Sequence, residues 1–251
     1  MRKISFIVFS TIIISLLSSN SIFAQQDTTA KENPFSIGCD IMSKYVWRGT
    51  DFGDAPSIQP GVSFTKAGFT IGAWGAIATS YKGYQETDLY ASYAYKFMSL
   101  TVTDYFFPSN TKTYNFFDYD DSSTGHILEV SLAFNGLENF PLTVMLATNV
   151  YGADNVRINP DGTTGDIQYS TYAEIAYAFK YVNVFMGTNL TNVDRENGET
   201  GFYGNYIGVV NLGVSATKNI KITKFYSLPL SVSLITNPQA EKIYLVAGIS
   251  F

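Results

Sequence analysis

The sequence has very little of what catalytic and disulfide-bonded proteins depend on. It contains one cysteine, Cys39, and one histidine, His126, in 251 residues. A single cysteine cannot form an internal disulfide, and we interpret Cys39 as a small apolar side chain on a strand. A single histidine argues against a Ser-His-Asp triad and against a multi-histidine metal site. The acidic cluster at 118–121 lacks the turn glycine and distal glutamate of a calcium loop. We therefore expect a non-enzyme without cofactor or metal.

Charge is also scarce. Charged residues make up 15% of the chain, whereas about a quarter is typical of soluble domains. The formal net charge is −5, which argues against nucleic-acid binding and does not suggest binding to an anionic membrane surface. Hydrophobic residues reach 46% and aromatics 16%, yet no apolar run after residue 24 approaches the roughly 20 residues of a membrane-spanning helix. A chain this apolar needs another way to shield its surface.

The first 24 residues have the layout of a secretory signal peptide. Arg2 and Lys3 precede an apolar run at 4–17, and small residues lead to Ala24. We expect cleavage after Ala24, which removes two positive charges and no negative one and leaves a net charge of −7. We expect residues 25–34 to form a short periplasmic segment and residues 35–251 to form one domain.

From Phe35 onward the dominant hydrophobic period is two, which is the signature of β-strands. About twelve such segments follow one another, and no segment of helical period competes with them. Tight connections at 66–68, 97–99 and 180–181 alternate with long ones at 49–56, 108–124, 152–166 and 192–204. An even strand count with short turns on one side and long loops on the other is typical of outer-membrane barrels. We predict an all-β fold, a transmembrane antiparallel up-and-down β-barrel, with both termini periplasmic.

The alternation also predicts which side chains face the lumen. An apolar face toward lipid leaves a polar face inside, and the first strand is expected to run past Trp47, with Tyr45 and Trp47 facing lipid. Val130, Val144 and Val210 are assigned to lipid in the same way, and Ser131 and Thr143 to the lumen. The lumen-facing candidates are Asp40, Lys44, Arg48, Gln59, Lys96, Glu129 and Glu174, together with Asp88. Two readings stay open: a polar constriction that selects solutes, or ion pairs that plug a narrow barrel.

The last strand carries a further signal. Apolar residues occupy every second position from Ile243 to the terminal Phe251, with Tyr244 and Gly248 between them. This pattern resembles the signal that the barrel-assembly machinery reads, so Tyr244, Gly248 and Phe251 are candidate assembly residues. The expected partners are outer-membrane lipid, the assembly machinery and periplasmic chaperones, and homo-oligomers are left open.

Several segments go beyond generic barrel patterning. Ser43-Lys44-Tyr45-Val46-Trp47-Arg48-Gly49 and the segment 56–61 resemble the N-terminal signature of the TorF-type porins, long catalogued as proteins of unknown function (the Gcw_chp family). Segments 68–74, 104–108 and 237–244 resemble the same family. The resemblance implies an outer-membrane barrel with a pore and brings no catalytic residues. It carries over to Tyr45, Arg48, Gly49 and Gln59, and Arg48 would face the lumen at the extracellular end of the first strand, pairing with a loop carboxylate or selecting solutes.

The expected function is passive diffusion of small hydrophilic solutes through an outer-membrane porin. The alternatives are a closed structural or adhesive barrel that acts through its extracellular loops, and an outer-membrane hydrolase, against which the single histidine argues.

Overall fold

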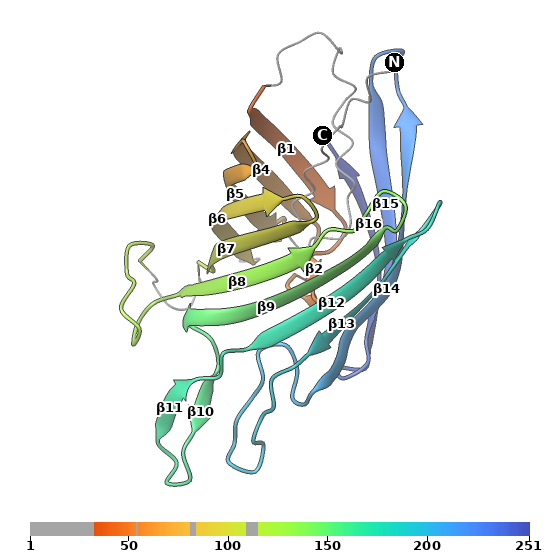
Figure 1. Cartoon of the computed structure of the whole chain (residues 1–251). Coiled ribbons are helices and arrows are strands. Elements are labelled where there is room, and N and C mark those ends of the chain that lie inside the picture. The colour runs from red at the N-terminus through yellow and green to blue at the C-terminus, as the bar shows by residue number, and fades with distance from the viewer. Residues whose placement is uncertain (1–32, 54, 81–83, 109–114) are drawn as a thin grey trace.

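The computed structural model describes residues 33–53, 55–80, 84–108 and 115–251, and these form an all-β molecule (Figure 1). The predicted signal peptide, 1–24, and most of the expected segment 25–34 lie outside the described residues. Among the residues that are described, no helix is long and apolar enough to cross a membrane. The twelve strands of the barrel are β1 (Phe35–Met42), β4 (Ser57–Lys66), β5 (Phe69–Ala78), β6 (Gln85–Tyr95), β7 (Met98–Phe106), β8 (His126–Phe134), β9 (Leu142–Gly152), β12 (Thr171–Ala178), β13 (Asn183–Asn189), β14 (Gly208–Lys221), β15 (Ser227–Asn237) and β16 (Lys242–Ser250).

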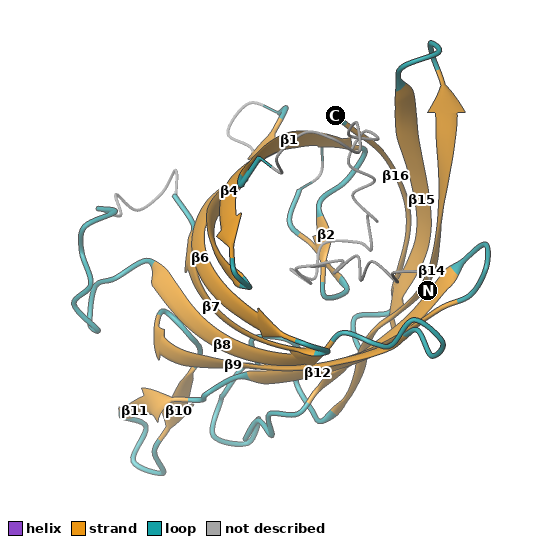
Figure 2. Ribbon diagram, turned by 45° about the horizontal axis from the view of Figure 1, so that its top comes forward, coloured by secondary structure: helices purple, strands orange, loops and turns teal. Residues whose placement is uncertain are grey.

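These strands close into one antiparallel barrel, which confirms the predicted fold class. Each strand pairs with its neighbours along the chain, and β1 pairs with β16 to close the ring (Figure 2). Two small hairpins stand apart from the barrel sheet: β2 (Val46–Trp47) with β3 (Thr50–Asp51), and β10 (Val156–Ile158) with β11 (Thr164–Ile167). Closure leaves no open sheet edge, which is the condition for strands to stand in a bilayer.

Side-chain exposure along the strands follows the expected alternation. On β8 and its neighbours, Leu132 and Val144 are exposed on the outside, and Glu129 is buried inside. The sheet register places Val130 opposite Val102 on the outer face and Ser131 opposite Thr101 on the inner face. The barrel therefore presents apolar side chains outward, and it encloses most of its buried polar side chains together with two buried apolar clusters, whereas a soluble barrel presents polar side chains outward.

The two ends of the barrel differ. The start of β1, Phe251 and most of the tight turns lie at one end, while the long connections and the β10–β11 hairpin lie at the other (Figure 1). The turn between β4 and β5 is made by Ala67 and Gly68, both with positive φ, as two-residue hairpin turns that match strand twist require. We call these the tight-turn end and the long-loop end.

Two sequence-based expectations are wrong in detail. Strand β1 ends at Met42, so Tyr45 and Trp47 do not face lipid but turn into the barrel and are buried. Val210, expected on the outer face, is buried inside, because the register between β13 and β14 shifts between Gly187 and Thr188. A bulge of this kind re-aims the side chain that it displaces.

Candidate functional site

The segment between β1 and β4 folds into the barrel as the β2–β3 hairpin (Figure 2). Its turn consists of Arg48 and Gly49, with φ of 48° and 80°, between the paired residues Trp47 and Thr50. Positive φ at both turn residues is the geometry of a type I′ hairpin, which favours glycine at the second position. Lys44 and Asp51 form an ion pair of 2.7 Å at the base of the hairpin. The hairpin is thus a locally complete unit that the chain can hold inside the lumen.

This hairpin reaches from one wall of the barrel to the other. At its base, the Tyr45 ring lies 5.6 Å from the ring of Trp74 on β5. At its tip, the Asn237 amide on β15 donates a 3.2 Å hydrogen bond to the Gly49 carbonyl. A side chain at Gly49 would place its Cβ 1.9 Å from the Val210 carbonyl oxygen on β14, so only glycine fits.

Arg48 carries its charge into the middle of the barrel. Its guanidinium binds both carboxylate oxygens of Glu129 on β8, and one of these two contacts is 3.0 Å long. The Tyr203 hydroxyl accepts a hydrogen bond from Arg48 and donates one of 3.0 Å to Glu129. The Tyr105 hydroxyl donates another to Glu129, at 3.2 Å. Both charged side chains are only 2% exposed, so the pair is desolvated and depends on these additional donors.

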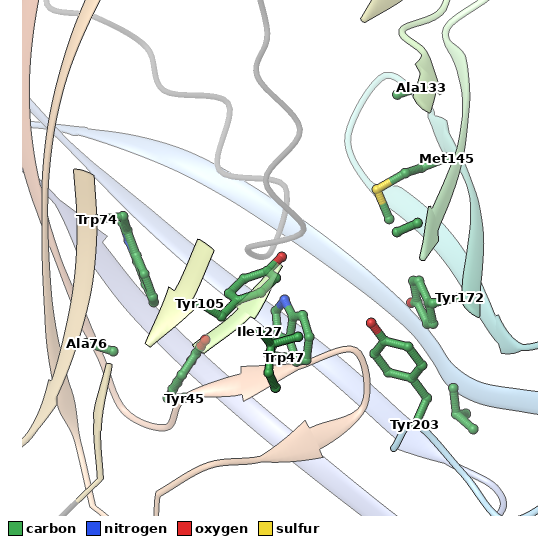
Figure 3. Close-up of a cluster of buried hydrophobic side chains, with 12 residues drawn as sticks. Tyr45, Trp47, Trp74, Ala76, Tyr105, Ile127, Ala133, Met145, Tyr172 and Tyr203 are labelled. Atoms are coloured by element: carbon green, nitrogen blue, oxygen red, sulfur yellow. The ribbon is translucent and has the colours of Figure 1, made fainter. Parts of the chain in front are cut away.

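Aromatic rings surround this ion pair, and Figure 3 shows four of them, Trp47, Tyr105, Tyr172 and Tyr203, close to one another inside the barrel. The Arg48 guanidinium lies 4.5 Å from the Trp47 ring centroid and 4.6 Å from that of Tyr172 on β12. Guanidinium groups stack well on such rings, which here also exclude water. We call the following six residues the lumen cluster: Trp47, Arg48, Tyr105, Glu129, Tyr172 and Tyr203. Its members come from the hairpin, from three strands of the wall and from one long loop.

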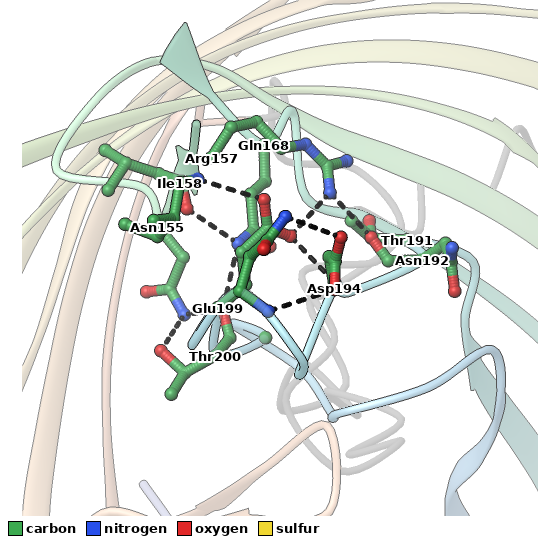
Figure 4. A network of polar contacts seen from close by, with 12 residues as sticks. Asn155, Arg157, Ile158, Gln168, Thr191, Asn192, Asp194, Glu199 and Thr200 are labelled. Carbon is green, nitrogen blue, oxygen red and sulfur yellow. Dashed lines mark hydrogen bonds and ion pairs between the residues drawn. The ribbon is translucent and has the colours of Figure 1, made fainter. Parts of the chain in front are cut away.

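That long loop, 190–207, is itself held from outside by the β10–β11 hairpin (Figure 4). The Glu199 carboxylate accepts hydrogen bonds from the backbone N–H groups of Asp194 and Ile158, at 2.9 and 3.0 Å. Arg157 on β10 adds an ion pair of 3.0 Å to Glu199 and donates to the Asn192 carbonyl. These backbone donors hold the pKa of Glu199 below its ordinary value. Glu199 therefore connects the external hairpin to the loop that delivers Tyr203.

The structure distributes the other predicted lumen residues unevenly. Gln59 on β4 is buried and donates a hydrogen bond of 2.7 Å to the Ser57 hydroxyl. Asp40 on β1 lies opposite Gln59. Glu174 accepts hydrogen bonds from Tyr172 and from Asn211, so it supports the lumen cluster without belonging to it.

Lys44 and Lys96 depart from the expectation. Lys44 lies beyond the end of β1, at the base of the hairpin, rather than on a strand. Lys96 is not in the lumen: it is exposed in the turn after β6, with φ of 54°, because the strand ends at Tyr95.

Three members of the lumen cluster, Tyr105, Tyr172 and Tyr203, were not predicted from the sequence to face the lumen. Tyr105 and Tyr172 alternate with outward-facing residues, so the period of two could have found them. Tyr203 lies in a loop, where no periodicity assigns a direction.

The single histidine lies away from the lumen, near the long-loop end of β8. Its ring nitrogens lie 2.7 Å from the Asp104 carboxylate and 2.7 Å from the Phe116 carbonyl oxygen, and its ring stacks on Tyr119. Both nitrogens are thus engaged in holding the loop after β7 against the wall. In that loop, Asp118 and Asp120 accept hydrogen bonds from neighbouring loop residues. Over the described ranges, no group of three or more potential metal ligands comes together.

This arrangement can do two things chemically. The polar groups of the inner wall can hydrogen-bond water and small hydrophilic molecules, and the hairpin with the lumen cluster occupies part of the space between the walls. An Arg–Glu pair that spans from the hairpin to the wall can break and re-form without a covalent change.

Comparisons with known proteins agree with the resemblance at the family level. A family model described as "Bacterial protein of unknown function (Gcw_chp)" matches residues 26–138. That stretch includes the hairpin, Arg48 and Glu129, but not Tyr172 or Tyr203. A search of curated proteins finds no match. Among solved structures, a triple mutant of the porin from Rh. blastica aligns with a TM-score of 0.39 and 14% identity over 88% of this chain and 74% of that one.

Proposed function

We propose that the protein is an outer-membrane porin through which small hydrophilic solutes diffuse passively, and that the β2–β3 hairpin limits this diffusion. The observation that carries the proposal is a closed barrel, apolar outside and polar inside, with a hairpin folded across its lumen. The exposed apolar belt needs lipid, because in water it would be an aggregation surface. The signal-peptide pattern at 1–24 accounts for export.

The same proposal places the long-loop end outside the cell and the tight-turn end in the periplasm. It also assigns the chain to the TorF-type porins, on the strength of the segment Tyr45-Val46-Trp47-Arg48-Gly49. We expect no enzymatic activity, because His126 has both ring nitrogens engaged outside the lumen.

A closed structural barrel is the second candidate, and the completeness of the packing favours it. The tip of the hairpin contacts β14 and β15, its base contacts β5, and the Arg48 charge is neutralised by Glu129. Such a barrel would act through its loops.

Liposome swelling in small sugars separates these two candidates. We expect slow swelling with the wild type and faster swelling when residues 44–53 are replaced by a short Gly-Ser linker. The control replaces only residues 160–163, at the tip of the external β10–β11 hairpin, and keeps the Arg157 and Ile158 contacts to Glu199, so it should leave swelling near the wild-type rate. If none of the three folded proteins caused swelling, the result would contradict the porin and support the closed barrel.

A further inference from the structure

Lysines gather at one end of the barrel. Of the lysines in the described residues, six lie at the tight-turn end, and all six are exposed: Lys66, Lys96, Lys180, Lys218, Lys221 and Lys224. We call them the lysine rim. Among the described residues, the acidic groups nearest this end are Glu138, in the turn before β9, Asp40, opposite Ser250 in the β1–β16 pairing, and the carboxylate of Phe251. The described part of this end is therefore net positive.

At the long-loop end, acidic groups outnumber basic ones. The net charge of the whole chain therefore does not reveal the lysine rim. Most of the carboxylates in the described residues lie in or near the long connections, among them Asp118, Asp120, Asp161 and Glu196. The net charge of −5 suggested no affinity for an anionic membrane surface. That conclusion requires evenly spread charge, and the topology separates the two signs instead.

Each basic turn also carries exposed aromatic rings. The Lys96 ammonium lies 5.2 Å from the ring of Tyr95, and the Lys180 ammonium lies 5.0 Å from the ring of Tyr181. These two rings are 61% and 75% exposed. Aromatic rings of this kind mark the level of a membrane interface, and lysine stems extend from there toward the headgroups.

The β14–β15 hairpin extends the rim beyond the barrel wall (Figures 1 and 2). Pairing with β13 ends at Ser215 and pairing with β16 ends at Leu230, so residues 216–229 project past both neighbours. Lys218, Lys221 and Lys224 lie on this projection, and Phe225 at its tip is 95% exposed. A basic projection with an exposed ring is suited to reach into a layer of phosphate groups.

We propose that the lysine rim binds the phosphate groups of anionic phospholipids in the leaflet that surrounds the tight-turn end. The inference rests on the proposed membrane location, and it adds a ligand class and an orientation. Each lysine near an anionic surface strengthens association about fivefold, so a few of them produce a measurable lipid preference. The aromatic rings set the depth and the ammonium groups supply the charge.

The test uses the full mature protein in vesicles of equal parts phosphatidylglycerol and phosphatidylcholine. Spin-labelled versions of both lipids report their relative association with the protein. We expect the wild type to prefer phosphatidylglycerol severalfold. This preference should fall in the Lys96→Gln/Lys180→Gln variant, which keeps four rim lysines, and should fall close to one at high salt. The charge-matched control, Arg195→Gln/Lys242→Gln, removes two cations from the long-loop end and should keep the wild-type preference.

Three outcomes would overturn the proposal: no preference in the wild type, an unchanged preference in the tight-turn variant, or an equal loss in the control. Insertion is scored separately, by the heat-dependent gel mobility of the folded barrel. Failure to insert would contradict the proposed function itself and is thereby distinguished from a failure of the rim.

Discussion

The role of Arg48 depends on the side chains that surround its guanidinium group. A guanidinium on a positive-φ turn residue would ordinarily be solvated, yet here it is buried against Glu129 and three rings. Replacing a buried pair by apolar residues is often neutral, whereas removing one partner strands a charge. The ion pair is therefore compatible with a stable barrel only while both charged partners are present.

Arg48→Ala and Glu129→Ala should each lower the free energy of unfolding by about 3–5 kcal/mol, because each leaves a buried charge unpaired. The double variant Arg48→Met/Glu129→Leu should recover most of that loss. Urea unfolding in vesicles measures this, since both tryptophans of the chain, Trp47 and Trp74, lie inside the barrel and report its opening. Lys44→Ala, which breaks a partly exposed pair, should cost at most about 1 kcal/mol and serves as the control. Equal costs for Lys44 and Arg48 would refute this account of the pair.

The assignment of side chains to the lipid face or to the lumen can be tested one residue at a time on β8. Val130→Arg places a charge on the lipid side and should cost about 2–4 kcal/mol if it lies at mid-membrane. Ser131→Arg points inward and should cost less. Equal folding yields for the two variants in vesicles would show that the inside and outside of the barrel had been exchanged.

Among the structural elements, the two inward segments depend on each other. The β2–β3 hairpin presents Arg48, loop 190–207 presents Tyr203, and β10–β11 holds that loop through Glu199. An element outside the barrel is thus connected to one within it by hydrogen bonds and a single ion pair.

Acid should loosen this connection. Because the pKa of Glu199 is held below its ordinary value, its contacts stabilise the loops fully above that ordinary value and weaken as the pH falls through the depressed one. We expect the protection factors of the Ile158 and Asp194 amides, which correct for the intrinsic pH dependence of hydrogen exchange, to fall on acidification. In Glu199→Gln they should be low at every pH. Protection factors that do not change with pH in the wild type would contradict the role of this carboxylate.

The barrel closes along a short seam. Strand β1 pairs with β16 at three positions, and Phe251 extends the seam by exchanging backbone hydrogen bonds of 3.0 and 3.3 Å with Cys39. Gly248 leaves room for Met42, since a Cβ there would lie 2.1 Å from its sulfur. Tyr244 packs against the buried group that includes Met42.

Deleting Phe251 should therefore impair assembly more than transport, since unpaired backbone groups in hydrocarbon cost several kcal/mol each. The amount of folded protein in the outer membrane should fall and periplasmic fragments should rise, whereas the barrels that do assemble should conduct as the wild type does. Normal assembly with altered conductance would instead place Phe251 in the pore.

Strands and their facing were predictable because a period of two is local and repeats at every segment. The β2–β3 hairpin was not, because Tyr45 and Trp47 continue the alternation of β1 while the chain has already turned inward. Only the dipeptide Arg48-Gly49, which suits a tight turn, indicated that the strand had already ended. The partners of Arg48 lie 81 and 155 residues away, a separation that no local pattern encodes.

For the whole molecule, three features form one account. The outer surface is apolar, the wall of the lumen is polar, and the charges separate between the two ends. Under the proposed function, a membrane location would account for the first, diffusion of solutes for the second, and a preferred orientation for the third. In the same proposal the hairpin across the lumen limits how far the pore is open.

Single-channel recording in planar bilayers tests this account most directly. The wild type should show rare, small conductance steps, and the variant with residues 44–53 replaced by a Gly-Ser linker should show frequent, larger ones, because the obstruction is gone. Arg48→Ala should fall between them. Identical currents from the wild type and the linker variant, both fully folded, would contradict the claim that the hairpin limits the pore.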